Sequence, residues 1–289
     1  MNDRAPPVSA RLGGGLTLVS TPIGAARDIT LRALDVLGAA DILAAEDTRT
    51  ARKLMDIHGI ALGGRRLVAC HDHSGEGVVR SLVDAMQGGA SVAYVSEAGT
   101  PLLSDPGFTL AREAISRGVP VTAAPGASAL LAALAVAGLP ADRFLFAGFL
   151  PSAAAQRRVA IQELAQVPAT LVLYESPKRV HDLLTDLRDT LGDRRAAVCR
   201  ELTKRFEEVR RGTLSELAAG TEGEEVRGEV VVVVDRGTPR EAGEEEVRAR
   251  LGEAMATMRM KDAATAVAGA LGLPRQRVYQ IALGMKEKG

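Results

Sequence analysis

Short apolar runs alternate with amphipathic segments along the first half of the chain. The apolar runs predict buried strands at residues 16–20, 41–46, 66–70, 91–96 and 119–124. Apolar positions at helical spacing predict helices at residues 31–40, 48–59, 77–87, 108–118 and 128–138. Strands that alternate with helices are typical of βαβ units, so this half predicts a mostly parallel sheet.

The pattern changes near residue 144, where strands follow one another more closely. Further strands are predicted at residues 169–175, 195–202, 206–214 and 229–237, with a helix at 176–192. Some of these strands have no helix between them, which predicts a mixed sheet. The small and polar segment FLPSAAAQ (149–156) reads as a linker at the start of this block.

The last part of the chain is helical after a charged, turn-rich segment at 237–246, which reads as a second linker. Residues 244–260 predict one helix, and 260–284 predict two short helices around a turn at Gly272 and Pro274, with Asp262 as a candidate N-cap. This outline fits a helix-turn-helix whose second helix opens with Arg275 and Arg277. The alternative is a helical hairpin that packs on the body or on a second subunit.

These patterns predict four regions in the 289 residues. They are a flexible leader at 1–14, an N-terminal α/β domain at 15–143, a C-terminal α/β domain at 144–238 and a helical tail at 243–289. The fold class is therefore α/β with two domains and a small helical addition.

Composition narrows the possible partners. Acidic and basic residues cancel at 36 each, so any nucleic acid or membrane partner needs a local patch. Aromatic residues make up 3% and Trp is absent, which argues against a base-stacking platform for single strands. Cys70 and Cys199 lie far apart and indicate free thiols in a reducing compartment. Without a signal peptide or a long apolar run, the chain is expected in the cytoplasm, away from membranes.

Loops that follow the predicted strands are rich in Gly, Pro and small hydroxyl residues. SEAGTPLLSDPG (96–107) contains no Lys or Arg, so it is not a phosphate-binding loop, and no dinucleotide fingerprint follows a strand. Gly99 and Gly126 permit close backbone approach, and the helix start at 126–128 offers N–H groups that suit a carboxylate. A ligand with a carboxylate, an adenosine and its own positive charge fits such loops, and S-adenosylmethionine is one. Read singly, each loop is an ordinary turn.

Several of these segments together resemble a known family. Residues 17–55, SEAGTPLLSDPG, 125–151, LYESPKRV (173–180) and RELTKRFEEVRRGTL (200–214) resemble, in order, the ribosomal RNA small subunit methyltransferase I family of the tetrapyrrole methylase-like superfamily. The likeness extends from about Leu16 to Asp235, and Glu97 stands where the family pattern leads us to expect Asp.

The resemblance implies a two-domain tetrapyrrole methylase-like fold, S-adenosylmethionine in the cleft between the domains, and a homodimer. It implies 2′-O-methylation of a cytidine in the decoding region of 16S rRNA, within the small ribosomal subunit, with no DNA partner. The residues expected to bind the cofactor are Pro22, Gly24, Glu97, Gly99, Thr100, Pro101, Leu103, Gly126, Ser128, Ala129, Tyr174 and Glu175.

Two charged segments are candidates for catalysis. In AEDTRT (45–50), Asp47 or Glu46 could handle the ribose 2′-hydroxyl and Arg49 could hold a phosphate; alternatively, Asp47 or Thr48 caps the next helix. In 200–212, Lys204 could lie near the reacting ribose within an RNA patch; alternatively, these cations protect a strand edge.

The segment CHDHS (70–74) places His71 and His73 on one face of an extended chain. A metal site needs three or four converging ligands, and the sequence shows no partner cluster, so no metal is expected.

Overall fold

The structure is a computed structural model that describes residues 12–71, 74–102, 107–223, 227–236, 244–271 and 273–286. The chain forms two compact units, residues 1–237 and 238–289, which are described separately. Most of the predicted leader, most of the second predicted linker and Gly272 lie outside the described residues. Within the described part, no helix has the length and apolarity that a membrane span requires.

The first sheet consists of five parallel strands, as the alternation of strands and helices predicts. Its order is β3-β2-β4-β1-β5. The strands are β1 (Gly15–Val19), β2 (Ile42–Ala45), β3 (Arg66–Ala69), β4 (Ser91–Val95) and β5 (Val121–Ala124). In the register, Leu16 of the interior strand β1 lies between Val92 and Val121. The carboxyl ends of all five strands therefore meet at one edge of the sheet.

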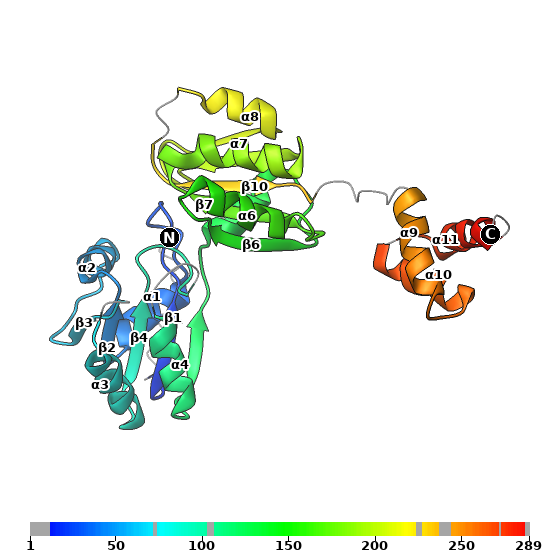
Figure 1. The fold of residues 1–289 in the computed structure, drawn as a ribbon. Helices are drawn as coiled ribbons and strands as arrows, with labels where there is room; N and C mark the ends of the chain where they lie inside the picture. The colour runs from blue at the N-terminus through cyan, green and yellow to red at the C-terminus, as the bar shows by residue number, and fades with distance from the viewer. Residues whose placement is uncertain are drawn as a thin grey trace, which may run out of the picture. The chain divides into compact units, whose positions relative to one another are not determined.

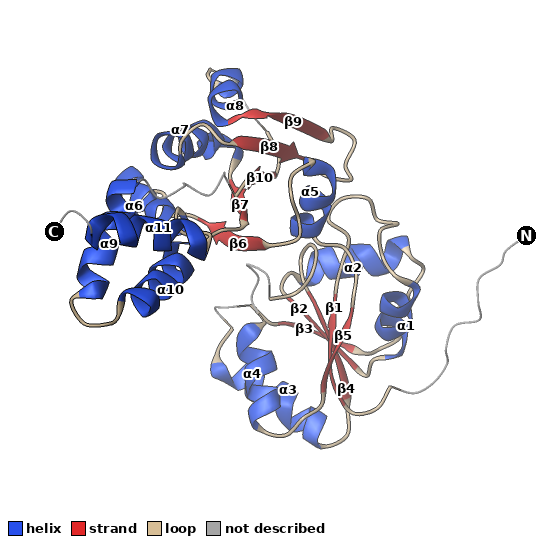
Figure 2. Ribbon diagram, turned by 90° about the vertical axis from the view of Figure 1, so that its right-hand side faces the viewer, coloured by secondary structure: helices blue, strands red, loops and turns tan. Residues whose placement is uncertain are grey.

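Helices cover both faces of this sheet (Figures 1 and 2). Apolar side chains of α1 (Leu31–Ala39) and α2 (Thr48–Ile57) pack on one face, and those of α3 (Glu76–Gln87) and α4 (Phe108–Ser116) pack on the other. The first of these helices begins after Thr30, whose hydroxyl accepts a hydrogen bond from the backbone N–H of Ala33 at 3.1 Å.

The second sheet is mixed, which confirms the prediction from its closely spaced strands. Its order is β6-β7-β10-β8-β9, with β6 and β7 parallel and the other pairs antiparallel. The strands are β6 (Phe144–Phe149), β7 (Thr170–Glu175), β8 (Arg195–Arg200), β9 (Glu208–Thr213) and β10 (Val230–Val234). The central β10 is five consecutive valines, all buried, as expected for a strand covered on both faces.

Helices also cover both faces of the second sheet. One face packs against α5 (Ala129–Ala137), and the other packs against α6 (Ala154–Leu164), α7 (Val180–Leu191) and α8 (Leu214–Thr221). A short 3₁₀ turn, η1 (Pro177–Arg179), precedes α7. In the chain, α5 comes before the predicted domain boundary at residues 143 and 144, yet its apolar side chains pack on the second sheet.

The prediction of a linker at 149–156 is wrong. Phe149 is the last residue of β6, and Ala154 already begins α6, so only a short loop separates them. The sequence analysis also missed α6 and α8. Arg157 lies on the buried side of α6 and interrupts its apolar pattern in the sequence. Its side chain does not face solvent but pairs with Asp186 of α7 at 2.6 Å.

The C-terminal unit has its own apolar core. Its helices are α9 (Glu244–Met255), α10 (Met260–Leu271) and α11 (Arg275–Lys286). Val247, Leu251, Val267 and Val278 are among the buried residues that all three helices contribute. Asp262 is not an N-cap, because α10 begins two residues earlier and the carbonyl of Arg259 accepts the N–H groups of its first turn.

Candidate functional site

A large cleft opens at the carboxyl ends of the strands of the first sheet. Its volume is about 930 Å³, within the range usual for small-molecule sites. Loops after β1, β2 and β4 line it from the first sheet, and the ends of β6, β7 and β10 line it from the second. Nine of the twelve predicted cofactor residues line this cleft: Pro22, Gly24, Glu97, Gly99, Thr100, Ser128, Ala129, Tyr174 and Glu175.

The loops from the first sheet are tied to one another by hydrogen bonds. Thr21 and Gly99 exchange two backbone hydrogen bonds, of 2.9 and 3.1 Å. Gly99 has a φ of 82°, a conformation that favours glycine, and Ser96 Oγ donates to its carbonyl oxygen. Thr100 Oγ1 then donates to the carbonyl oxygen of Ala127 at 3.0 Å. The backbone that faces the cleft is therefore fixed before any ligand arrives.

A close contact joins the β1 loop to the second sheet. A Cβ atom at Gly24 would lie 2.5 Å from Cγ of Lys204, so only glycine fits here. The neighbouring Ala25 N–H donates to Thr203 Oγ1 at 3.1 Å. Glu201 and Thr203 have positive φ values of 50° and 64°, so this contact holds the second-sheet loop in an uncommon backbone conformation.

The start of α5 presents polar groups to the cleft. Ser128 precedes the helix, and its buried Oγ has no hydrogen-bond partner among the described residues. Tyr174 of β7 reaches across, and its hydroxyl oxygen accepts the N–H of Leu130 at 3.2 Å. Burial raises the pKa of Tyr174, so the phenol stays neutral. A hydroxyl without a partner beside a helix N-terminus is suited to donate a hydrogen bond to a ligand's carboxylate.

Acidic groups outnumber basic groups around the cleft. The carboxylates are those of Glu46, Glu97, Glu175 and Glu229, and the cations are Lys53 and Lys204. The buried Glu175 is already paired with Arg179, at 3.0 Å. Glu46 accepts a hydrogen bond from the backbone N–H of Glu97 at 3.3 Å. The surplus of negative charge suits a cationic ligand better than a phosphate.

Lys204 is held by two carboxylates at the cleft. Its Nζ lies 2.9 Å from Glu201 Oε1 and 3.0 Å from Glu229 Oε2. Burial alone would lower the pKa of Lys204, but the hydrogen bonds to these carboxylates outweigh burial and raise it. Lys204 therefore stays protonated at neutral pH and cannot act there as a general base.

Asp47, which is half-buried, and the exposed Arg49 form an ion pair at the start of α2. The Asp47 carboxylate accepts the backbone N–H of Arg49 at 2.7 Å and pairs with its guanidinium at 2.8 Å. The hydrogen bond from the Arg49 side chain lowers the pKa of Asp47 to about 2. Asp47 is thus the N-cap of α2, the alternative considered from the sequence, and neither residue lines the cleft, whereas Glu46 does.

The remaining predicted cofactor residues lie elsewhere. Pro101 is buried and does not line the cleft, and Leu103 lies outside the described residues. Gly126 is not among the lining residues; it allows close packing on Ser20, because a Cβ atom there would lie 2.9 Å from Ser20 Cβ.

The structure also adds lining residues that the sequence analysis did not select. They include Ile23, Thr50, Lys53, Phe149, Glu229 and Val231. Thr50 ends the segment already considered for chemistry, and Lys53 follows it by one helical turn, so this spacing could have identified them. No local signal marks Glu229 or Val231, because their place depends on the pairing of β10 with β7.

Most cations of the predicted RNA patch at 204–211 have partners within the protein. Arg210 pairs with Glu208 at 2.8 Å, and Arg211 donates to the carbonyl oxygen of Val136. Arg205 lies over the ring of Phe206. Of the two histidines considered for metal binding, His73 lies outside the described residues. No group of three potential metal ligands occurs among the residues that are described.

Comparison with known sequences identifies the family. Residues 15–218 match the sequence model of the tetrapyrrole (corrin/porphyrin) methylases, and residues 241–286 match that of the RsmI C-terminal HTH domain. The chain is 46% identical over 274 residues to ribosomal RNA small subunit methyltransferase I of Mesorhizobium japonicum, covering 94% of this chain and 92% of that one. The chain belongs to the ribosomal RNA small subunit methyltransferase I family. The protein of the same name from Pseudomonas aeruginosa is 43% identical over 282 residues, covering 95% of this chain and 99% of that one.

Solved structures confirm the predicted tetrapyrrole methylase-like fold. Diphthine synthase superimposes with a TM-score of 0.59 at 18% identity, covering 76% of this chain and 89% of that one. Uroporphyrin-III C-methyl transferase from Thermus thermophilus, solved with S-adenyl homocysteine, gives a TM-score of 0.52 at 23% identity, covering 77% and 97%. For the tail, the match to an HTH domain favours the helix-turn-helix over a simple hairpin.

Proposed function

We propose that this protein transfers a methyl group from S-adenosylmethionine to the 2′-hydroxyl of a cytidine ribose in the decoding region of 16S rRNA. The observation that supports this most is the 930 Å³ cleft, which combines strand-end loops, an orphaned hydroxyl and surplus negative charge, in a member of an rRNA methyltransferase family. The partner is the small ribosomal subunit, and the reaction takes place in the cytoplasm.

S-adenosylmethionine as the cofactor is confirmed by family membership, and the residues of the cleft fit it. Ser128 Oγ and the N–H groups at the start of α5 bind its carboxylate. Glu97, which is exposed and forms no ion pair among the described residues, faces its positive charge. The loop at 96–107 contains no Lys or Arg, which would repel the positive charge of the cofactor. When bound, the cofactor supplies a methyl group on a positively charged sulfur.

Glu46 is the residue we assign to accept the proton of the ribose hydroxyl. It lines the cleft at the end of β2, and its hydrogen bond from the N–H of Glu97 fixes the carboxylate. Lys204 is protonated and uses two of its three N–H groups on Glu201 and Glu229, so the third can donate to an oxygen of the substrate. Asp47 and Arg49 act from outside the cleft lining, by capping α2 and holding its first turn in place.

The proposal includes a homodimer. Phe108 and Ile115 lie two turns apart on α4 and are 61% and 64% exposed, which suits a surface covered by another subunit. Sedimentation of the full chain tests the dimer, and a monomeric mass at micromolar concentration would contradict it.

The function is tested with methyl-labelled S-adenosylmethionine and small ribosomal subunits from cells that lack this enzyme. We expect one equivalent of label on one cytidine ribose, located by fragment mapping of the RNA. Absence of label while the cofactor still raises the melting temperature of the protein would exclude the rRNA acceptor and leave the methylase fold with another substrate.

The role of Glu46 is tested by Glu46→Gln. The amide can still accept the Glu97 N–H but cannot take a proton, so we expect kcat to fall about 10²-fold or more. The dissociation constant of S-adenosylmethionine, measured by calorimetry, should change less than threefold. A kcat within threefold of the wild type would remove Glu46 from proton transfer.

A further inference from the structure

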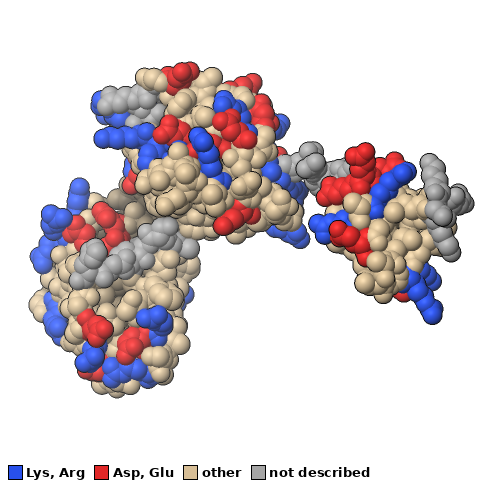
Figure 3. Space-filling model, in the orientation of Figure 1, with Lys and Arg blue, Asp and Glu red and all other residues tan. Residues whose placement is uncertain are grey.

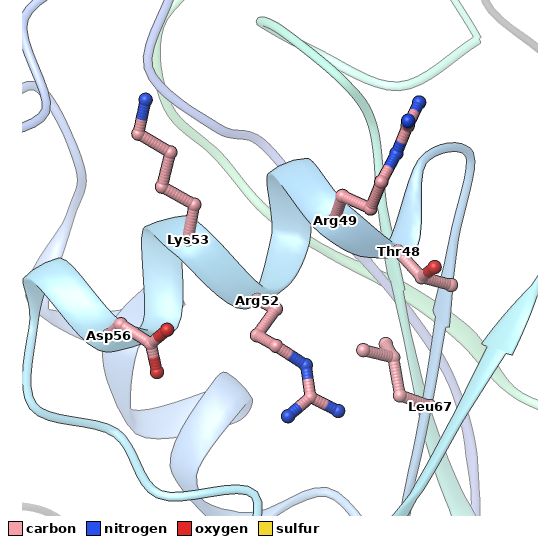
Figure 4. Close-up of a pocket in the computed structure, with 6 residues that line it drawn as sticks. All are labelled: Thr48, Arg49, Arg52, Lys53, Asp56 and Leu67. Carbon is pink, nitrogen blue, oxygen red and sulfur yellow. The ribbon is translucent and has the colours of Figure 1, made fainter.

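A second, shallower hollow lies along the outer side of α2, beside the cleft. Its volume is about 350 Å³, and its lining is mostly charged: Thr48, Arg49, Arg52, Lys53, Asp56 and Leu67 (Figure 4). Thr48, Arg52 and Asp56 lie four positions apart on one side of α2, and Arg49 and Lys53 lie four positions apart on the adjoining side. In Figure 4, Arg52 points toward Leu67, whereas Arg49 and Lys53 point away from it. Figure 3 shows Lys and Arg side chains gathered on the part of the surface where α2 lies.

The three cations of this hollow differ in availability. The guanidinium of Arg49 donates two hydrogen bonds to the Asp47 carboxylate, of 3.2 and 2.8 Å. Arg52 and Lys53 are exposed, and among the described residues neither forms an ion pair with a carboxylate. The opposite side of α2, with Ala51 and Met55, is buried in the core, so the charged side cannot turn inward.

Lys53 connects the hollow to the cleft. It lines both, and Thr50, one turn before it, lines the cleft as well. Glu46 lies just before the same helix. A chain of alternating ribose and phosphate groups could therefore lie along α2 with one ribose at Glu46 and the adjoining phosphates beside Lys53 and Arg52.

The chemistry of the hollow requires an anion that the cofactor does not supply. S-adenosylmethionine has no phosphate, and the carboxylate site at the start of α5 is formed by other elements. With a net charge of zero, the chain has no general field that attracts nucleic acid, so RNA must be held by local cations. Asp56 offsets one of the charges, which limits how many phosphates the hollow can take.

We propose that Arg52 and Lys53 bind the backbone phosphates that flank the methylated nucleotide, and so guide the RNA strand across α2 into the cleft. This inference rests on the proposed rRNA methyltransferase function. The sequence analysis expected Arg49 to hold a phosphate. Because Arg49 is already paired with Asp47, we assign this contact to Arg52 and Lys53 in the next turn of the helix.

The test is the double variant Arg52→Gln and Lys53→Gln, with small ribosomal subunits as substrate. Gln forms helices well, so α2 should stay folded. We expect KM for the subunits to rise about tenfold, with kcat and cofactor affinity unchanged. Loss of two contacts to single-stranded phosphates should also reduce the slope of log KM against log salt by about 1.4.

The matched control is Arg80→Gln with Arg188→Gln, which removes the same charge from the exposed sides of α3 and α7, away from α2. Arg80 is 69% exposed. The control should change KM less than twofold. An α2 variant with unchanged KM and salt slope would overturn the inference, and so would a control that loses as much as the α2 variant. Failure of the proposed function itself is distinguishable, because the wild-type protein would then place no label on the RNA.

Discussion

The two basic segments of the α/β unit, Arg49–Lys53 on α2 and Lys204–Arg211 before and within β9, look alike in sequence and differ in the folded protein. In the second segment, Lys204 pairs with Glu201 and Glu229, and Arg210 pairs with Glu208. In the first, Asp47 holds only Arg49, while Arg52 and Lys53 form no ion pair within the described part of the chain.

The difference shows that the number of cations in a segment does not tell how many can bind RNA. Carboxylates near in sequence, such as Glu208, and distant ones, such as Glu229, can neutralise them first. A cation that is paired inside a cleft can still orient a substrate, and a cation that is free on a helix can supply affinity. We therefore expect variants of the two segments to change different kinetic constants.

Lys204→Ala should have the largest effect of the variants that probe this comparison. Without the ammonium group, Glu201 and Glu229 face each other and the donor to the substrate is lost, so kcat should fall about 10²-fold. KM and its salt dependence should stay as in the wild type, in contrast to the α2 double variant. Lys204→Arg, which keeps the charge, should recover part of kcat in the same assay. If Lys204→Ala instead raised KM and reduced the salt slope, the two segments would both bind phosphate.

Asp47→Asn should have a smaller effect than Lys204→Ala, and it should lower KM for the small ribosomal subunits rather than kcat. Asn remains a good N-cap but releases the guanidinium of Arg49, which adds a third cation to the hollow, so KM should fall about twofold. Because the pKa of Asp47 is lowered to about 2, its contribution to stability is present above its usual pKa of 3.8 and lost only as the pH falls towards 2. The pH profile of kcat between 5 and 8 should thus be the same in both proteins, and a collapse of kcat would identify Asp47 as the base.

Arg205→Gln should have the smallest effect. Arg205 is exposed and contacts only the ring of Phe206 among the interactions described, so its loss should change KM less than twofold. Steady-state kinetics at two salt concentrations measures this directly. A tenfold rise in KM would instead show that the segment Lys204–Arg211 binds RNA.

The sequence predicted the order of strands and helices wherever apolar periodicity was clear. It failed at α6, because Arg157 occupies the buried side and satisfies its charge with Asp186, a residue 29 positions away. It also missed the short α8, although Thr213 and Glu216 form a capping box that the spacing T-x-x-E announces. The buried ion pair of α6 depends on tertiary structure and could not be read from the sequence. The capping box of α8 could have been read from the sequence.

The candidate site was predictable to the extent that strand-end loops form it. Gly99 and the helix start at Ser128 were selected from such loops, whereas Thr100 and Tyr174 were expected from the family resemblance, and all four line the cleft. The pairing state of the charges was not predictable, because it depends on β10 lying between β7 and β8, which brings Glu229 to Lys204. Gly126 was selected for ligand approach but serves packing on Ser20.

The position of α5 determines at which residue the protein can be truncated and still fold. A fragment ending at residue 143 would keep this helix but lose Val172, Val231 and Val233, which cover its apolar side. Such a fragment would expose Leu130 and Leu134 and should aggregate, although it contains every strand of the first sheet. Truncation after residue 237 instead follows the boundary between the two compact units and leaves this apolar contact whole.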